Sequence, residues 1–119
     1  MTQEDKELLL KDLCARLPYG VIIQVKDWTD LDAELKIGHI NRLQINDVEL
    51  KPYLFPLSSM TDAEKEEYCQ LQQRVIYNSK GPVNEDVTKY INFCYRKHLD
   101  INNLISIGLA IDATGLNIY

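Results

Sequence analysis

The segment Lys51-Pro52-Tyr53-Leu54-Phe55-Pro56-Leu57-Ser58-Ser59-Met60-Thr61 separates a β-rich half of the chain from a helical half. Its two prolines have no backbone N–H, and each biases the residue before it towards extended geometry. Proline is largely confined to the edges of sheets. We therefore expect an edge strand or an extended arm here, and not a central strand.

The end of this segment carries a helix-start signal. Thr61 and Glu64 have the spacing of a capping box, in which each side chain accepts a hydrogen bond from the backbone N–H of the other residue. Met60 precedes the cap and is placed to act as its hydrophobic staple. The pattern predicts a helix that runs to about Tyr77.

A second helix is predicted over residues 85–98, with Asn84 as its cap. Arg96, Lys97 and His98 fall in its last turn, where the helix dipole favours cations, so we expect His98 to be charged there. Its apolar stripe consists of Val87, Tyr90, Ile91, Cys94 and Tyr95.

Upstream of the proline-bounded segment, the pattern predicts one helix and a small sheet. Residues 2–17 show helical periodicity, residues 21–25 form a β-branched run, and residues 31–37 alternate between apolar and polar. Residues 40–45 and 48–50 are candidates for further strands. The first helix has the apolar stripe Leu9, Leu10, Leu13, Cys14 and Leu17.

These elements predict a single α+β domain over residues 1–119. We expect an N-terminal helix, a small antiparallel sheet of three or four strands, two main helices and a short extended C-terminal tail. A chain of 119 residues can build one hydrophobic core without disulfide or metal staples. Cys14, Cys69 and Cys94 are widely spaced and are expected to be small buried hydrophobes.

Charge and hydropathy argue against several classes of partner. The net charge is −5 and the basic residues are scattered, so no nucleic acid is expected as a partner. No apolar run approaches the ~20 residues that span a bilayer, and the acidic N-terminus does not fit a secretory signal. We therefore expect a soluble cytoplasmic protein without a membrane partner.

The candidate metal ligands have a simpler structural interpretation. Asp27, Asp30, Asp32 and Glu34 could supply oxygens to a cation, but their spacing is not that of an EF-hand. An acidic turn followed by the solvated face of a strand explains them better. The two histidines lack the paired spacing typical of zinc sites. We expect no metal and no cofactor.

Catalytic motifs are also missing from the sequence. Ser58 and Ser59 precede a helix N-terminus but lie in no G-x-S-x-G elbow, and no glycine-rich phosphate loop is present. A small hydrolase or ligand-binding protein with a cleft near His39 and Ser58/Ser59 is therefore only the alternative hypothesis.

Four aromatic residues have no place on an apolar stripe: Trp28, Tyr53, Phe55 and Tyr119. Tyrosine and tryptophan are enriched at protein interfaces, so these residues are candidates for an exposed interaction surface. The alternative is that they seal the core under loops. The leading hypothesis is a small non-enzymatic protein-interaction module that binds an unknown protein partner or self-associates.

The Lys-Pro-Tyr-Leu-x-Pro-Leu-Ser-Ser-Met-Thr run at residues 51–61 resembles a family of short uncharacterised proteins from gut anaerobic bacteria and their phage-like or mobile elements. Leu17-Pro18-Tyr19-Gly20 and Gly108-Leu109-Ala110-Ile111-Asp112-Ala113 are similar to that family too. The resemblance carries no known activity and no catalytic residue. It implies an accessory protein of a mobile element.

Overall fold

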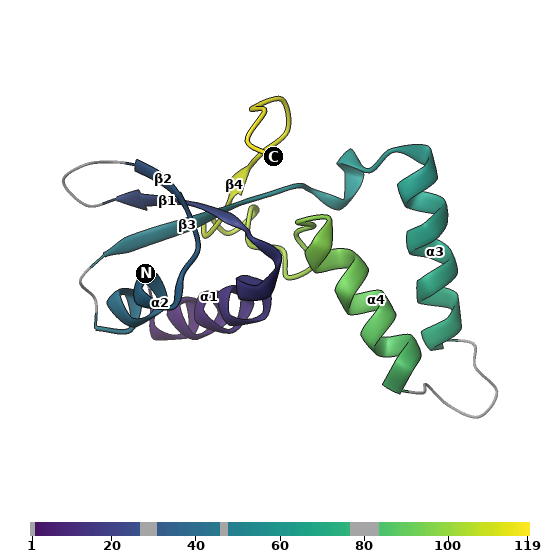
Figure 1. Cartoon of the computed structure of the whole chain (residues 1–119), viewed down its shortest axis with the longest axis horizontal. Coiled ribbons are helices and arrows are strands. Elements are labelled where there is room, and N and C mark those ends of the chain that lie inside the picture. Colours follow the sequence, from purple (N-terminus) through teal and green to yellow (C-terminus); the bar gives the residue numbers. More distant parts are fainter. Residues whose placement is uncertain (1, 27–30, 46–47, 77–83) are drawn as a thin grey trace.

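Helix α1 (Gln3–Arg16) begins as its sequence predicts, because the Thr2 hydroxyl accepts a hydrogen bond of 3.1 Å from the backbone N–H of Asp5. The computed structural model describes residues 2–26, 31–45, 48–76 and 84–119. Helices α1 and α2 (Ile37–Gln44) lie on one side of a sheet (Figure 1). Together with the sheet they form what we call the sheet lobe.

The sheet has four strands in the order β2-β1-β3-β4. They are β1 (Ile22–Lys26), β2 (Leu31–Glu34), β3 (Glu49–Leu54) and β4 (Ile111–Asp112). Strand β1 pairs antiparallel with β2 and β3, whereas β4 pairs parallel with β3. The α+β class is confirmed, but the sheet is mixed because the C-terminal tail returns to supply β4.

The strand predicted over residues 40–45 is wrong, because this stretch lies in α2. His39 Nδ1 accepts the backbone N–H of Lys36 at 3.0 Å, which fixes the first turn. Ile40 and Leu43 are three residues apart, and both are buried in the core that α1 shares. The six residues 40–45 hold three apolar side chains, too few to distinguish the helical from the strand period. Packing against α1 goes with the helical conformation.

The edge-strand prediction for the proline-bounded segment also needs correction, because β3 lies inside the sheet between β1 and β4. Pro52 is opposite Ile23 of β1. On the other side of β3, β4 reaches only Tyr53 and Leu54. Residues 49–52 thus have a neighbouring strand on one side only within the described chain. A proline is tolerated there, because its missing N–H breaks no second ladder.

The second half of the chain forms a helical hairpin of α3 (Asp62–Ile76) and α4 (Asn84–Arg96), which projects from the sheet lobe (Figure 1). The capping box is confirmed: Thr61 N–H donates to Glu64 Oε1 at 3.0 Å, and Glu64 N–H donates to Thr61 Oγ1 at 3.2 Å. The hairpin core holds buried Phe93, Cys94 and Leu99. Half-buried side chains pack around them: Phe55, Met60, Tyr68, Leu71, Tyr90 and Ile101.

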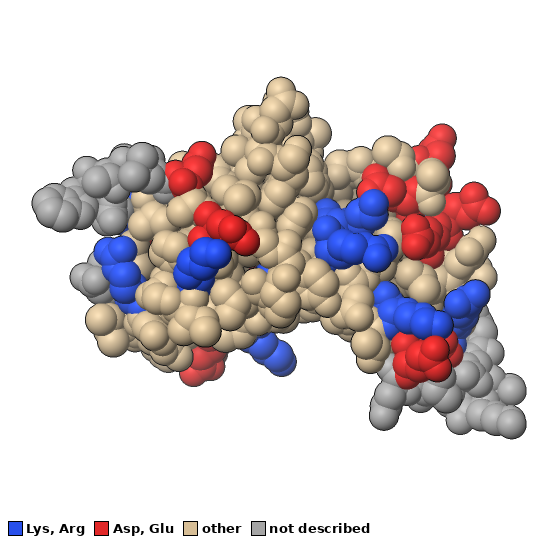
Figure 2. All heavy atoms as spheres, viewed as in Figure 1, with Lys and Arg blue, Asp and Glu red and all other residues tan. Residues whose placement is uncertain are grey.

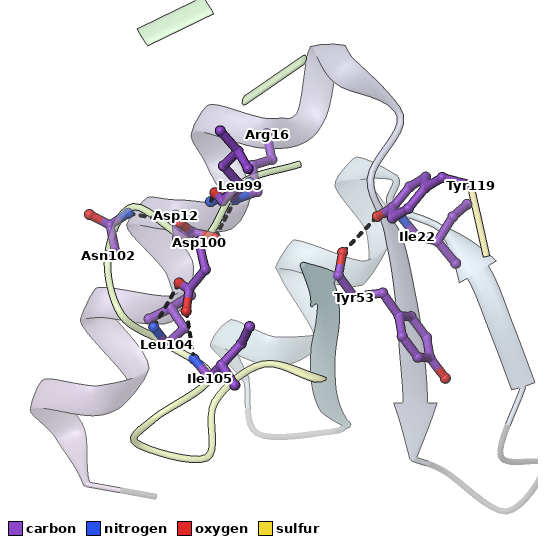
Figure 3. Close-up of polar contacts among 10 residues, drawn as sticks. All are labelled: Asp12, Arg16, Ile22, Tyr53, Leu99, Asp100, Asn102, Leu104, Ile105 and Tyr119. Carbon is purple, nitrogen blue, oxygen red and sulfur yellow. Dashed lines mark hydrogen bonds and ion pairs between the residues drawn. The ribbon is translucent and has the colours of Figure 1, made fainter. Parts of the chain in front are cut away.

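A buried ion pair joins the two lobes (Figure 3). Arg16 Nε donates to Asp12 Oδ2 at 2.7 Å with both side chains 0% exposed. Arg16 Nη2 donates to the carbonyl of Leu99 at 2.6 Å, and Asn102 Nδ2 donates to Asp12 Oδ1 at 2.8 Å. The guanidinium also lies 4.8 Å from the centre of the Tyr95 ring. A charge on α1 therefore holds the chain that follows α4.

The cysteine prediction holds for one residue of three. Cys94 is buried, whereas Cys14 and Cys69 are exposed. On α1 the buried face is shifted from the predicted stripe: it consists of Leu9, Asp12, Leu13 and Arg16.

Among the described residues, no helix is long and apolar enough to span a bilayer.

Candidate functional site

A pocket of about 300 Å³ opens where the sheet lobe meets the hairpin. We call it the junction pocket. Its walls come from the proline-bounded segment, from the start of α3 and from the end of α4. Phe55, Met60 and Leu99 give it an apolar lining. The polar lining residues are Ser59, Glu64, Arg96, Lys97 and His98.

Backbone pairing across the junction builds this pocket. Phe55 N–H donates to the carbonyl of His98 at 2.8 Å, and Asp100 N–H donates to the carbonyl of Phe55 at 2.9 Å. These bonds continue β3 beyond its last residue and align it with the chain that leaves α4. The Asp100 carboxylate then accepts the backbone N–H groups of Leu104 and Ile105 at 2.8 and 3.0 Å (Figure 3). The pocket walls are therefore fixed by hydrogen bonds.

The pocket has more positive than negative charge. Lys97 Nζ lies 3.9 Å from Glu64 Oε2, a long ion pair. The other oxygen of Glu64 already accepts the capping N–H of Thr61. Arg96 is exposed, and no carboxylate of the described residues pairs with it. Figure 2 shows basic side chains gathered beside the acidic start of α3.

The burial of His98 favours a neutral imidazole, which argues against the cation expected at the end of α4. Burial and, to a smaller extent, the nearby charge of Arg16 lower the pKa of His98 to about 4. Its backbone has a φ of 56°, in the left-handed region that often ends helices. Its Nδ1 is buried and has no hydrogen-bond partner among the described residues.

Tyr119 connects His98 to the sheet. The two rings stack with centroids 3.8 Å apart and planes 11° apart. The Tyr119 hydroxyl accepts the N–H of Ile22 and donates to the carbonyl of Tyr53, both at 2.8 Å (Figure 3). Burial raises the pKa of Tyr119 to about 12. Tyr119 as a whole residue is still 44% exposed.

The four unplaced aromatic residues do not share one exposed surface. Tyr53 is 6% exposed, and its hydroxyl donates to Asp32 Oδ1 at 2.8 Å, so the expectation of exposure is wrong for this residue. Phe55 lines the junction pocket and packs against Tyr119 with ring centroids 5.8 Å apart. Trp28 lies outside the described residues. The structure thus brings Phe55 and Tyr119 together.

The pocket that Ser59 lines does not include His39. His39 lies in α2 of the sheet lobe, whereas the two serines lie in the short helical turn η2 (Leu57–Ser59) between β3 and α3 (Figure 1). Ser59 shares the junction pocket with the other histidine, His98. Its hydroxyl donates to the carbonyl of Pro56 at 2.7 Å. This geometry does not prepare the hydroxyl for proton transfer to an imidazole.

The acidic cluster is only partly described. Asp27 and Asp30 lie outside the described residues, Asp32 accepts the Tyr53 hydroxyl, and Glu34 lies 3.5 Å from Lys36 Nζ. Within residues 2–26, 31–45, 48–76 and 84–119, no group of three or more His, Cys, Asp or Glu side chains could hold a metal ion.

A second hollow of about 290 Å³ lies between the two helices of the hairpin, and we call it the hairpin groove. Leu71 and Phe93 supply its apolar surface. The polar lining residues are Glu67, Lys89, Asn92 and Arg96. Arg96 therefore lines both hollows.

Sequence reasoning treated Arg96 and Lys97 only as favourable charges at a helix end. The only hint in the sequence was that both residues lie at the end of a predicted helix. Side chains there can face the segment against which the following chain packs. The partner wall from residues 55–64 depends on tertiary pairing. No protein-family model, curated protein or solved structure matches this chain.

Proposed function

We propose that this protein is a non-enzymatic protein-interaction module that binds an amphipathic helix of a partner protein in the hairpin groove. One observation carries this proposal: all fifteen residues of α3 are described, and none of them is buried. Isolated helices of this length are marginal in water, and most helical stability comes from packing. A third helix against the hairpin would add the burial that α3 lacks.

The chemistry of the groove suggests the partner. Leu71 and Phe93 offer an apolar floor for an apolar stripe at helical spacing. Lys89 and Arg96 are two turns apart on α4, so both line the same side of the groove. We therefore expect a partner helix with acidic residues on the flank that faces α4. The exposed apolar residues Ile76 and Val87 add further contact area on the hairpin.

Catalysis is not part of this proposal, because the serine in the junction pocket donates its proton to a carbonyl and the groove has no nucleophile–base pair. The resemblance of residues 51–61 to short proteins of gut anaerobes supports a role as an accessory protein of a mobile element.

A photo-crosslinking experiment tests this function. A benzophenone amino acid replaces Glu67 at the groove or, as the control, exposed Glu4 on α1. In lysate of the source organism we expect an adduct at position 67 and not at position 4. Mass spectrometry should map the adduct to an amphipathic helical segment with acidic residues. The Lys89→Glu variant should lose it, because charge reversal repels that segment.

Three outcomes would contradict the proposal. Equal adducts at both positions would indicate non-specific contact, and an unchanged yield in the Lys89→Glu variant would remove the role of charge. A crosslink to a second copy of this chain would replace the partner protein by self-association.

A further inference from the structure

We propose that the junction pocket binds a small monocarboxylate with an aromatic or branched aliphatic body. Of the residues that line this site, Arg96 alone also lines the hairpin groove. The inference depends on the size of the pocket, its apolar floor and Arg96, which pairs with no carboxylate of the described residues.

The size of the pocket sets the size of the ligand. A volume of about 300 Å³ lies at the small end of the range of roughly 300–1,000 Å³ typical of ligand sites. This room suits one ring or one branched side chain. Phe55 offers a ring for stacking, and Met60 can adapt to an irregular shape.

The charges select an anion. Arg96 presents a guanidinium, whose planar fork matches a carboxylate with two parallel hydrogen bonds. Lys97 adds a second cation whose own ion pair with Glu64 is long at 3.9 Å. The carboxylate of Glu64 would repel a bound anion. The hydrogen bond from the N–H of Thr61 to Glu64 Oε1 weakens this repulsion at that oxygen.

The lowered pKa of His98 limits the charged residues that can attract the anion. With the pKa of His98 lowered to about 4, the imidazole carries no charge near neutral pH. Anion binding in that range therefore depends on the cations Arg96 and Lys97. The imidazole remains a polar wall that can form a hydrogen bond with a carboxylate oxygen.

Titration followed by two-dimensional amide NMR tests the proposal with 3-phenylpropionate as the probe, up to about 10 mM. We expect saturable shifts confined to residues 55–64 and 96–99. The matched amide, 3-phenylpropionamide, keeps the ring and loses the charge, so it should bind at least roughly tenfold more weakly. Acetate keeps the charge and loses the ring, and it should give no saturable shift.

Matched variants identify the residues. Arg96→Gln should weaken 3-phenylpropionate binding roughly tenfold, and Lys97→Gln about two- to threefold. Lys89→Gln changes a cation of the hairpin groove that does not line the junction pocket, so it should leave binding unchanged. Lys89 and Arg96 lie on α4 and Lys97 directly follows it, and none of the three is buried. A dispersed amide spectrum checks that each variant is folded.

The proposal is overturned if the acid and the amide bind equally, if Arg96→Gln has no effect, or if no saturable shift occurs. The test is also independent of the proposed function. Loss of the crosslink at Glu67 with retained acid binding would remove only the partner helix. Retained crosslinking in Lys97→Gln with no acid binding in the native chain would remove only the ligand.

Discussion

The sheet lobe and the helical hairpin differ in how much of their apolar surface is buried. Among the described residues, the core of the sheet lobe has 14 buried side chains, whereas the hairpin core has three. Helices α1 and α2 and the strands share the first core. In the hairpin, α3 packs against α4, and within the described residues α4 also contacts α1 at the base of the hairpin. A lobe that leaves apolar side chains exposed is suited to contact with another molecule.

The two lobes are joined by polar groups as well as by apolar packing. Arg16 reaches from α1 to the carbonyl of Leu99, and Tyr119 bridges Ile22 and Tyr53 beside His98. Buried polar contacts are strongly directional, and removing one partner leaves the other without a bond. We call these contacts of Arg16, Leu99, His98 and Tyr119 the joint. Substitutions in the joint should therefore disturb the position of the hairpin more than substitutions elsewhere.

The largest expected effect is at this joint. Asp12→Ala leaves the buried guanidinium of Arg16 without its carboxylate and should lower the free energy of unfolding by about 3–5 kcal/mol, measured by urea denaturation. The double variant Asp12→Leu/Arg16→Met removes both charges and should recover much of this loss. A double variant as unstable as Asp12→Ala would show that the cost comes from packing.

A matched pair of leucines compares the two cores directly. Leu13→Ala in the sheet lobe should cost about 3 kcal/mol, because its side chain is 0% exposed and leaves a cavity. Leu71→Ala in the hairpin should cost about 1 kcal/mol, because this side chain is only partly buried. Urea denaturation gives both values. Equal losses would contradict the contrast between a closed core and an open one.

The joint should also respond to pH. The pKa of His98 is lowered to about 4 in the folded chain, below the value near 6.5 of an unfolded one, so the unfolded state binds more protons between these values. Stability is therefore full above pH 6.5 and decreases as pH falls towards 4. We expect a loss of roughly 1 kcal/mol between pH 7 and pH 5, reduced by the partial exposure of the ring.

His98→Asn is the control for this pH dependence, because asparagine tolerates the positive φ of 56° and does not titrate. Denaturation curves at both pH values should show a smaller difference for the variant than for the native chain. An identical pH dependence would assign the loss to other groups.

The smallest effect is expected at the capping box. Thr61→Ala removes the acceptor for the N–H of Glu64 and should cost about 1 kcal/mol. Hydrogen exchange should show faster exchange in α3 and little change in β1, because the hairpin opens locally before the sheet lobe does. Equal acceleration in both would indicate that the two lobes unfold as one unit.

Short-range physics explains which parts of the fold were predictable. The caps at Thr2 and at Thr61/Glu64, the long helical periods and the strand near Ile23 depend on residues within four positions of one another. The strand prediction for residues 40–45 of the chain was wrong because six residues are too few to distinguish the helical period from the strand period. The junction pocket was missed because its two walls are about 40 positions apart in the sequence.

The sequence by itself determined the α+β class, the helix boundaries set by capping and the division of the chain at the proline-bounded segment. Only the tertiary structure decided that Pro52 lies in an inner strand, that Asp12 and Arg16 are buried together and that the pKa of His98 is lowered. The reason is physical: capping and periodicity are local. Burial, ladder pairing and the pKa of a side chain depend on which distant residues the fold places beside it.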